Sequence, residues 1–328
     1  MKILITAPYN EEARQELKEK AGEIVYKPWK PQGRAYNEQE LKDLLDETKA
    51  TALITEHDEV TDPVIRAFPG LQFIGVCRGT PSNVAVSTAR ELGIPVFHTP
   101  ARNAQAVAEM FLSNVITLLR NTREGCSWLE EERWEAGAHT SYLQFKGNEL
   151  AGKTVGTVGF GAIGRRIAAM LEPFPCKILF YDPFVESPKP SWKKTDLEEV
   201  FSGSDIVSVH LPVNDQTRGM IGKTLFSKMK PGAIFVNTAR AVVVNREDLL
   251  EVLESGRIRG AVLDVFDHEP PDSTDYRIIH LSNVLATPHI AGATFEVEDH
   301  HAAIMNKAVL GWLRERGSTL SQLENKAV

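Results

Sequence analysis

The chain has 328 residues, with 37 basic and 44 acidic side chains and a formal net charge of −7. At about 100–200 residues per domain, this length predicts two domains. Ordinary numbers of glycine (23) and proline (18) exclude collagen-like and largely disordered chains. The acidic balance argues against general binding along a phosphate backbone, without excluding one local basic patch. No apolar run approaches the roughly 20 residues of a membrane helix. Cys77, Cys126 and Cys176 form no CxxC pair, so we expect a cytoplasmic protein.

In the first hundred residues, short β-branched runs alternate with helical stretches, the pattern of βαβ units in a parallel sheet covered on both faces. The predicted strands are Lys2–Thr6, Glu23–Tyr26, Ala52–Thr55, Gln72–Cys77 and Pro95–Phe97. The predicted helices are Glu11–Ala21, Glu38–Lys49, Pro63–Phe68 and Val84–Leu92. The alternation then stops. Ala101–Arg123 is predicted as one long amphipathic segment, followed by the charged stretch Trp128–Trp134 and the loop Gly137–Gly147.

A second alternating series starts at Lys153–Val158. Its later predicted strands are Lys177–Tyr181, Asp205–His210, Ala233–Asn237, Gly260–Val265 and Asn283–Ala286. Its predicted helices are Ala162–Leu171, Leu197–Phe201, Lys223–Lys228 and Arg246–Ser255. The last helix, Glu296–Arg316, has no strand of its own nearby, so we expect it to cross back onto the first domain. The sequence predicts an α/β protein with two doubly wound parallel-sheet domains, residues 1–100 plus 290–328 and residues 101–289.

A glycine motif follows the first strand of the second series. The exact GxGxxG runs into a predicted helix and comprises Gly159, Gly161, Ala162, Ile163 and Gly164. Such glycines permit a tight turn, a close approach of the backbone to a pyrophosphate, and close helix–strand packing. Asp182 stands eighteen residues beyond the last glycine, at the end of the next predicted strand, where an acid accepts the ribose hydroxyls of NAD and repels the extra phosphate of NADP. The alternative is a glycine turn with an ordinary strand-terminal Asp. We predict NAD.

Three polar residues close successive predicted strands of the second half: Arg240, Glu269 and His289. Ligands of open parallel sheets bind outside the carboxyl ends of the strands, so all three are expected at one crevice. A His moves a proton near neutral pH, a carboxylate orients it, and an Arg binds a substrate carboxylate and polarises a carbonyl. Singly, each has another interpretation: a loop histidine, a surface ion pair, a turn residue before two prolines. Their joint placement indicates hydride transfer between a carbonyl and a hydroxyl.

Several motifs then resemble one family in order and spacing, from about Gly70 to Thr294. They are Gly159–Gly164, Val209–Pro212 with Thr217, Asn237–Arg240, Asp264–Pro270 and Thr287–Gly292. The chain is similar to the D-isomer-specific 2-hydroxyacid dehydrogenases, with the nearest likeness to the phosphoglycerate dehydrogenase-like branch. The resemblance implies a flavodoxin-like substrate domain, a Rossmann NAD-binding domain, and a homodimer whose interface and hinge include Ala101–Arg123.

The resemblance also implies roles for individual residues. It makes Arg240 the substrate binder and carbonyl polariser, His289 the proton donor or acceptor, and Glu269 its partner. Asp264 is expected at the nicotinamide carboxamide. The other residues that it places along the cofactor are His210, Pro212, Thr217, Thr238, Ala239 and Gly292.

One loop departs from the family pattern. Members usually carry a Gly-Val-Asp-Asn-like loop in the first domain, whereas this chain has Val76–Val84 with different residues. The substrate therefore cannot be carried over from the family. Arg78 and Gly79 are our candidates for the substrate carboxylate, and Asn103 is a further candidate. Arg78 hints at an anionic or hydroxylated tail, although an Arg needed for domain closure would look identical.

The hypothesis is an NAD-dependent oxidoreductase that interconverts a D-2-hydroxy acid and its 2-keto acid. An NADH-sensing, corepressor-like binding protein and a phosphite dehydrogenase remain alternatives, whereas formate dehydrogenase is disfavoured because it has Gln where Glu269 stands. No metal site is expected: His300 and His301 are interpreted as part of a solvated helix face. Cys77 is interpreted as a buried hydrophobic residue rather than a reactive thiol.

Overall fold

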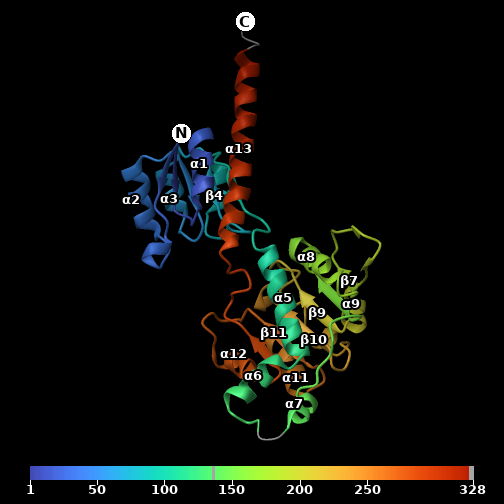
Figure 1. Ribbon diagram of the computed structural model, residues 1–328. Helices are drawn as coiled ribbons and strands as arrows, with labels where there is room; N and C mark the ends of the chain where they lie inside the picture. Colours follow the sequence, from blue (N-terminus) through green and yellow to red (C-terminus); the bar gives the residue numbers. More distant parts are fainter. Residues whose placement is uncertain (135–136, 325–328) are drawn as a thin grey trace. The chain divides into compact units, whose positions relative to one another are not determined.

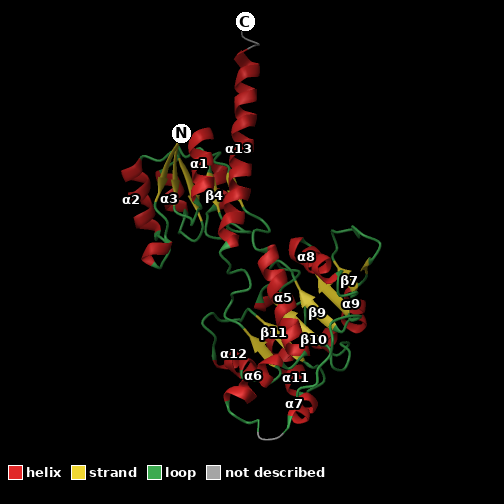
Figure 2. Ribbon diagram, in the orientation of Figure 1, coloured by secondary structure: helices red, strands yellow, loops and turns green. Residues whose placement is uncertain are grey.

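The structure, a computed structural model, describes residues 1–134 and 137–324 and divides into two compact units (Figure 1). Unit 1 comprises residues 1–103 and the chain from Thr294 onward. Unit 2 comprises Ala104–Ala293. Each unit is an α/β layer structure with helices around one parallel sheet (Figure 2).

Unit 1 contains a five-stranded parallel sheet in the order β2-β1-β3-β4-β5, the flavodoxin-like order. The strands are β1 (Lys2–Ile5), β2 (Glu23–Tyr26), β3 (Ala52–Thr55), β4 (Ile74–Val76) and β5 (Val96–His98). The helices are α1 (Glu11–Lys20), η1 (Lys30–Gln32), α2 (Glu38–Thr48), α3 (Asp62–Ala67), α4 (Val86–Glu91) and α13 (Glu296–Glu324).

The two faces of this sheet follow from the alternation of side chains along each strand. Ile3 and Ile5 of β1 face the side covered by α1 and α13, whereas Leu4 faces the side covered by α2, α3 and α4. All three side chains are fully buried, and burial of each contributes about 1.5–3 kcal/mol. On the first side, Met305 of α13 packs into the same core as α1. The α13 helix therefore completes the core of unit 1.

Unit 2 contains a seven-stranded parallel sheet in the order β12-β11-β10-β9-β6-β7-β8, the Rossmann order with an added strand. The strands are β6 (Thr154–Val158), β7 (Lys177–Tyr181), β8 (Trp192–Lys194), β9 (Ile206–Val209), β10 (Ile234–Asn237), β11 (Gly260–Leu263) and β12 (Val284–Ala286). The helices are α5 (Ala104–Leu119), α6 (Thr122–Glu130), α7 (Ala138–Gln144), α8 (Ala162–Leu171), α9 (Leu197–Gly203), α10 (Lys223–Phe226), η2 (Ala241–Val243), α11 (Arg246–Glu254) and α12 (Ser273–Ile279).

Two separate apolar clusters cover the faces of the second sheet. Phe111 of α5 and Ile167 of α8 pack against one face, in a cluster that includes Val236 of β10. Phe226 of α10 and Leu250 of α11 pack against the other face. The predicted fold class, two doubly wound parallel-sheet domains, is therefore confirmed. Among the described residues, no helix is both long and apolar enough to cross a membrane.

Some predicted elements are wrong. The segment Ala101–Arg123 is not one helix: α5 ends at Leu119, and Asn121, with φ of 50°, turns the chain before α6 begins. The stretch Gly137–Gly147, predicted as a loop, contains the helix α7. Besides the short helices η1 and η2, two described elements were not predicted. They are the short edge strand β8 and the helix α12.

Candidate active site

The candidate functional residues of unit 2 follow strands that lie side by side in one parallel sheet. Gly159 follows β6, Asp182 follows β7 and His210 follows β9. Arg240 follows β10, and the remaining candidates follow β11 and β12. Since the strands are parallel, all these positions lie at the carboxyl edge of the sheet, where ligands of such folds bind.

The glycine motif forms a cradle, and side chains in place of its glycines would collide with the backbone or occupy the open space. Gly159 has φ of +93°, and a Cβ there would lie 2.5 Å from the carbonyl oxygen of His210. A Cβ on Gly164 would lie 2.7 Å from the carbonyl oxygen of Gly159, so this glycine lets α8 pack closely against the turn. A Cβ on Gly161 would meet nothing within 4 Å. The backbone at Gly161 is therefore open to a ligand such as a pyrophosphate, with Ala162 and Ile163 in the first turn of α8.

The carboxylate of Asp182 is hydrogen-bonded to this cradle. Its Oδ2 accepts a hydrogen bond of 2.8 Å from the backbone N–H of Phe160, inside the glycine motif. Its Oδ1 accepts one of 2.9 Å from the N–H of Phe184. These bonds hold the carboxylate at the end of β7, the position from which an acid recognises the ribose of NAD.

His210 lies between the cradle and the end of β9. The hydroxyl of Ser208 lies 2.9 Å from its Nε2, while its Nδ1 is buried without a partner among the described residues. Burial lowers the pKa of His210 to about 3, because a charged ring would lose its hydration. The ring is therefore neutral at physiological pH. Nearby, the hydroxyl of Thr217 donates to the carbonyl oxygen of Pro212 at 2.7 Å and fixes the following turn.

The turn after β10 is organised by Asn237, which is buried. Its Oδ1 accepts from the N–H of Ala239 at 3.0 Å, and its Nδ2 donates to the carbonyl oxygen of Arg240 at 3.0 Å. Thr238 is buried, and its hydroxyl lacks a partner among the described residues. The guanidinium of Arg240 is exposed and donates to the carbonyl oxygen of Ala239 at 2.6 Å. The turn thus presents a cation at the sheet edge.

His289 and Glu269 form a direct pair. The Nδ1 of His289 lies 2.8 Å from Oε2 and 3.0 Å from Oε1 of Glu269. A carboxylate only accepts hydrogen bonds, so Nδ1 carries the proton and Nε2 is the nitrogen available for proton exchange. Both side chains are 43% exposed. His289 has φ of 55°, a conformation that the loop after β12 imposes on it.

Asp264 holds that loop in place. Its buried carboxylate accepts from the hydroxyl of Thr287 at 2.6 Å and from the N–H groups of Ile290 and Ala291, both at 2.8 Å. These residues flank His289, so Asp264 orients it. The predicted contact between Asp264 and the nicotinamide stays a prediction, as does that of Gly292, which lies in the same loop. The orienting role was missed, because its partners lie 23 to 27 residues away.

The predicted substrate residues Arg78, Gly79 and Asn103 belong to unit 1. Arg78 and Gly79 follow β4 after one intervening residue, Cys77, at the carboxyl edge of that sheet. A ring nitrogen of His98 lies 2.9 Å from the carbonyl oxygen of Gly79 and holds the loop. Asn103 is the last residue before unit 2 and is partly exposed.

Sequence reasoning missed a polar cluster at the same edge of unit 1. Glu56 follows β3 and is buried, and its carboxylate accepts from Arg102 at 2.6 Å and from the indole N–H of Trp29 at 3.2 Å. The same nitrogen of Arg102 lies 2.9 Å from Nδ1 of His301. An acid directly after a buried strand was the available signal.

The interpretation of His300 and His301 as a solvated helix face is wrong for His301. That side chain is fully buried against the carbonyl oxygen of Pro8, at 2.6 Å, because the first turns of α13 pack onto unit 1. His300 is exposed. Cys77 is fully buried, as predicted, and burial raises the pKa of its thiol well above the ordinary value.

Unit 2 thus presents, on one sheet edge, a dinucleotide cradle with a ribose-type acid, an exposed Arg and a His–carboxylate pair. This combination fits an oxidoreductase that uses a nicotinamide dinucleotide. Comparison with known proteins specifies the class further. The chain belongs to the D-isomer specific 2-hydroxyacid dehydrogenase family, whose NAD-binding domain matches residues 112–291. It is an NAD-dependent enzyme, and its cofactor is NAD(H).

Relatives from bacteria match along most of the chain. The protein named "Putative 2-hydroxyacid dehydrogenase YoaD" from Bacillus subtilis is 57% identical over 99% of this chain and 95% of its own length. A hydroxypyruvate reductase from Thermotoga maritima is 37% identical over 73% of this chain and 77% of its own length. Among solved structures, D-lactate dehydrogenase from Aquifex aeolicus, complexed with NAD and lactic acid, matches with a TM-score of 0.72 and 25% identity over 99% of this chain and 98% of that chain.

Proposed function

We propose that this dehydrogenase interconverts a D-2-hydroxy acid and its 2-keto acid with Arg240, Glu269 and His289 as its catalytic residues. The observation that carries the proposal is the hydrogen-bonded pair of Glu269 and His289, 2.8 Å apart at the carboxyl edge of the NAD-binding sheet. Such a pair is what proton exchange with a substrate oxygen requires. Bound NAD(H) supplies the hydride acceptor or donor.

The residues of unit 2 divide the remaining work. In the direction of reduction, Nε2 of His289 donates a proton to the carbonyl oxygen of the keto acid. Glu269 keeps Nδ1 protonated and stabilises the charged imidazolium before the transfer. The guanidinium of Arg240 binds the substrate carboxylate with its fork of donors and polarises the carbonyl. In the direction of oxidation, the same nitrogen of His289 takes the hydroxyl proton.

The glycine cradle and Asp182 are proposed to hold the dinucleotide. A Cβ at Gly161 would meet no atom within 4 Å, so the backbone there is open, which fits a pyrophosphate at the start of α8. The carboxylate of Asp182 already lies against the cradle, at 2.8 Å from the N–H of Phe160, which fits recognition of a ribose rather than of a 2′-phosphate. His210, Pro212, Thr217, Thr238 and Ala239 are proposed to line the rest of the cofactor site.

For the substrate we propose an acid with an anionic or hydroxylated tail. Arg78, Gly79 and Asn103 remain the proposed substrate residues of unit 1. The support is their placement: His57 and Arg78 follow the neighbouring strands β3 and β4. Burial lowers the pKa of His57, the charge of Glu56 opposes this, and the charge of Arg78 lowers the pKa further. A relative of this chain is named for hydroxypyruvate, a hydroxylated keto acid.

The direct test follows NADH absorbance with purified protein and a panel of 2-keto acids. The panel contains glyoxylate, pyruvate, phenylpyruvate, hydroxypyruvate, phosphohydroxypyruvate and sugar-derived keto acids. We expect turnover with the members whose tail is hydroxylated or anionic. In the variant His289→Gln we expect kcat to fall by about 10²–10⁴-fold while NADH binding is retained. Turnover by His289→Gln at the wild-type rate would contradict the assignment.

We also propose that the protein is a homodimer. Large apolar side chains are exposed on and beside α6 and α7, namely Leu129, Trp134, Tyr142 and Leu143. Such a concentration of exposed apolar surface is typical of a protein interface. Light scattering after size exclusion should give twice the chain mass, and Leu129→Lys with Tyr142→Lys should give monomers. The cytoplasmic location stays a prediction.

A further inference from the structure

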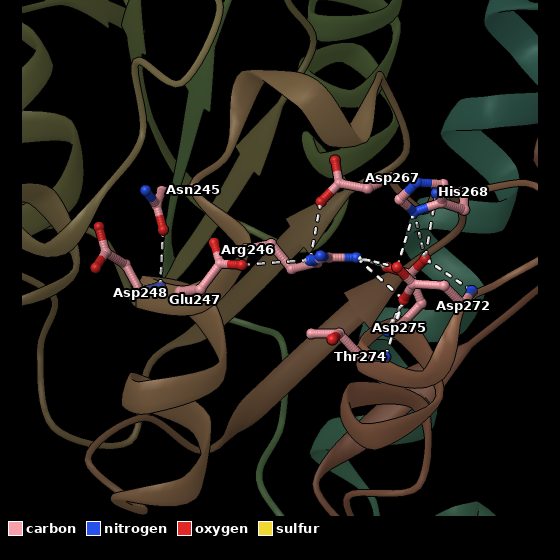
Figure 3. A network of polar contacts seen from close by, with 9 residues as sticks. All are labelled: Asn245, Arg246, Glu247, Asp248, Asp267, His268, Asp272, Thr274 and Asp275. Atoms are coloured by element: carbon pink, nitrogen blue, oxygen red, sulfur yellow. Dashed lines mark hydrogen bonds and ion pairs between the residues drawn. The ribbon is translucent and has the colours of Figure 1, made fainter.

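The loop that carries Glu269 is tied to a neighbouring helix by one arginine. Arg246 begins α11, and its guanidinium reaches across to the segment between β11 and α12 (Figure 3). Its Nη1 donates to Asp272 at 3.0 Å and to Asp275 at 3.3 Å. Its Nε lies 3.3 Å from Oδ2 of Asp267, a charge contact without an aligned hydrogen bond. One side chain therefore contacts both ends of the segment 267–275.

The contacts of Arg246 enclose Glu269 on both sides. Asp267 stands two residues before Glu269, and Asp272 three residues after it. Asp275, which is 2% exposed, accepts from the N–H of His268 and from the N–H of Asp272, both at 3.2 Å. The loop is thus closed by acids whose negative charge Arg246 partly offsets, and Glu269 lies between the residues that Arg246 contacts.

The charge balance depends on the same arginine. Burial raises the pKa of the Asp267 carboxyl, and the positive charge of Arg246 opposes that rise. The hydrogen bonds to Asp272 raise the pKa of Arg246, so the cation stays charged. Without it, the carboxylates of Asp267, Asp272 and Asp275 would repel one another inside a partly buried loop. Repulsion of these acids would open the loop in which Glu269 stands.

Few other contacts among the described residues hold the carboxylate of Glu269. Besides the pair with His289, the contact of its carboxylate within the loop is a long hydrogen bond of 3.4 Å from the N–H of Phe266. Both partners of the pair are substantially exposed. The geometry of the pair therefore depends on where the backbone of the loop is held.

We propose that Arg246 is a positioning residue for the reaction: by clamping Asp267, Asp272 and Asp275, it holds Glu269 against His289. This inference rests on the proposed function of that pair. Arg246 touches neither residue, so it acts through the loop. The ligand atoms of His268, Asp272 and Asp275 lie within 4.8 Å of one another, but Arg246 already supplies the positive charge there, so we propose no metal ion.

The first experiment compares Arg246→Met with wild type by steady-state kinetics, in the presence of EDTA. A displacement of a catalytic group by about 1 Å costs up to about 100-fold in rate, so we expect kcat to fall by roughly 10- to 100-fold while NADH affinity stays the same. Arg246→Lys should restore part of the loss, because lysine retains the charge but not the fork. Wild-type kcat in Arg246→Met overturns the proposal.

Arg277 provides a matched control. It joins the same two helices, α11 and α12, through Glu254 at 2.6 Å, but it is exposed and does not touch the loop. Arg277→Met should therefore leave kcat unchanged. An equal loss of kcat in both variants would show a general effect of joining the helices and would refute the positioning role.

A double-mutant cycle shows whether the effect passes through Glu269. If it does, Arg246→Met should cost little further kcat in a Glu269→Gln background, because the pair is already lost. The same fold-loss in both backgrounds contradicts the proposal. Should Arg246→Met fail to fold, Asp267→Asn removes only the contact before Glu269, and a several-fold loss of kcat is expected from it; full activity in this variant counts against the clamp.

A spectroscopic measurement separates this proposal from the proposed function. In protein with ¹⁵N-labelled histidine, the His289 signal is assigned by its absence in His289→Gln, and its Nδ1 shift reports the hydrogen bond to Glu269. We expect Arg246→Met to move this shift toward that of Glu269→Gln. If wild type reduces no keto acid, the proposed function fails, yet the shift still tests the clamp. An unchanged shift in Arg246→Met overturns it.

Discussion

The neutral ring of His210, with its buried Nδ1, predicts how stability depends on pH. An unfolded histidine takes up a proton near pH 6.5, whereas the folded ring does so only at about 3, because Nδ1 is buried without a partner among the described residues. Below about pH 6.5 the unfolded chain binds one more proton than the folded protein. Stability from this group is therefore complete above pH 6.5 and falls as the pH decreases, by about 1.4 kcal/mol per pH unit.

Between pH 6.5 and pH 5, this single ring should cost about 2 kcal/mol of unfolding free energy. Urea unfolding of wild type and His210→Gln at both pH values measures it, since glutamine keeps a polar group near Ser208 but does not titrate. The unfolding free energy of wild type, relative to that of His210→Gln, should be about 2 kcal/mol lower at pH 5 than at pH 6.5. The exposed His139, substituted by Gln, is the control and should change nothing. A His210 ring signal that titrates near pH 6.5 in the folded protein would refute the reasoning.

Three further predictions concern the cofactor cradle and the His289 loop. Asp182→Ala removes the negative charge beside the cradle, so the ratio of kcat/KM with NADPH to that with NADH should rise at least tenfold; no change would contradict the ribose assignment. Gly159→Ala forces a Cβ to within 2.5 Å of a carbonyl oxygen, so NADH affinity should fall at least tenfold in calorimetry, whereas Gly33→Ala, also at positive φ but in open space, should leave it intact. Asp264→Asn leaves a buried N–H of the loop unpaired, and we expect a loss of about 1–3 kcal/mol in unfolding free energy together with lower kcat.

Most of the fold is predictable from local patterns, since parallel buried strands are short apolar runs and the helices between them are amphipathic. The errors arise where a single residue or a distant contact decides the structure. Asn121 ends the long helical segment by adopting φ of 50°, and α6 begins at the next residue. The short strand β8, of sequence Trp-Lys-Lys, pairs with β7 and packs Trp192 into the core, contacts that its sequence pattern does not report. The helix α12 carried an overlooked signal, because Asp272 and Asp275 form a capping box after two prolines.

Candidate site residues are predictable from the sequence where a side chain that can take part in catalysis closely follows a predicted strand. The positions of Arg240, Glu269 and His289 follow from strands that end at one sheet edge. By contrast, Asp264 orients His289 across 23 to 27 residues, and Arg246 contacts Asp272 across 26 residues. No periodicity or spacing reports such contacts. They depend on how neighbouring crossovers pack, which is a property of the folded sheet.

The position of α13 in unit 1 has a consequence for biosynthesis. The sheet of unit 1 is made first, yet the helix that covers the face with Ile3 and Phe73 lies beyond all of unit 2. At 5–20 residues per second, translation of residues 104–293 takes roughly 10–40 s. During that interval α1 covers part of this apolar face, while the part that packs against Ala302, Met305 and Val309 of α13 stays open as unit 2 folds. The newly made chain is therefore expected to depend on chaperones until α13 emerges and closes the first unit.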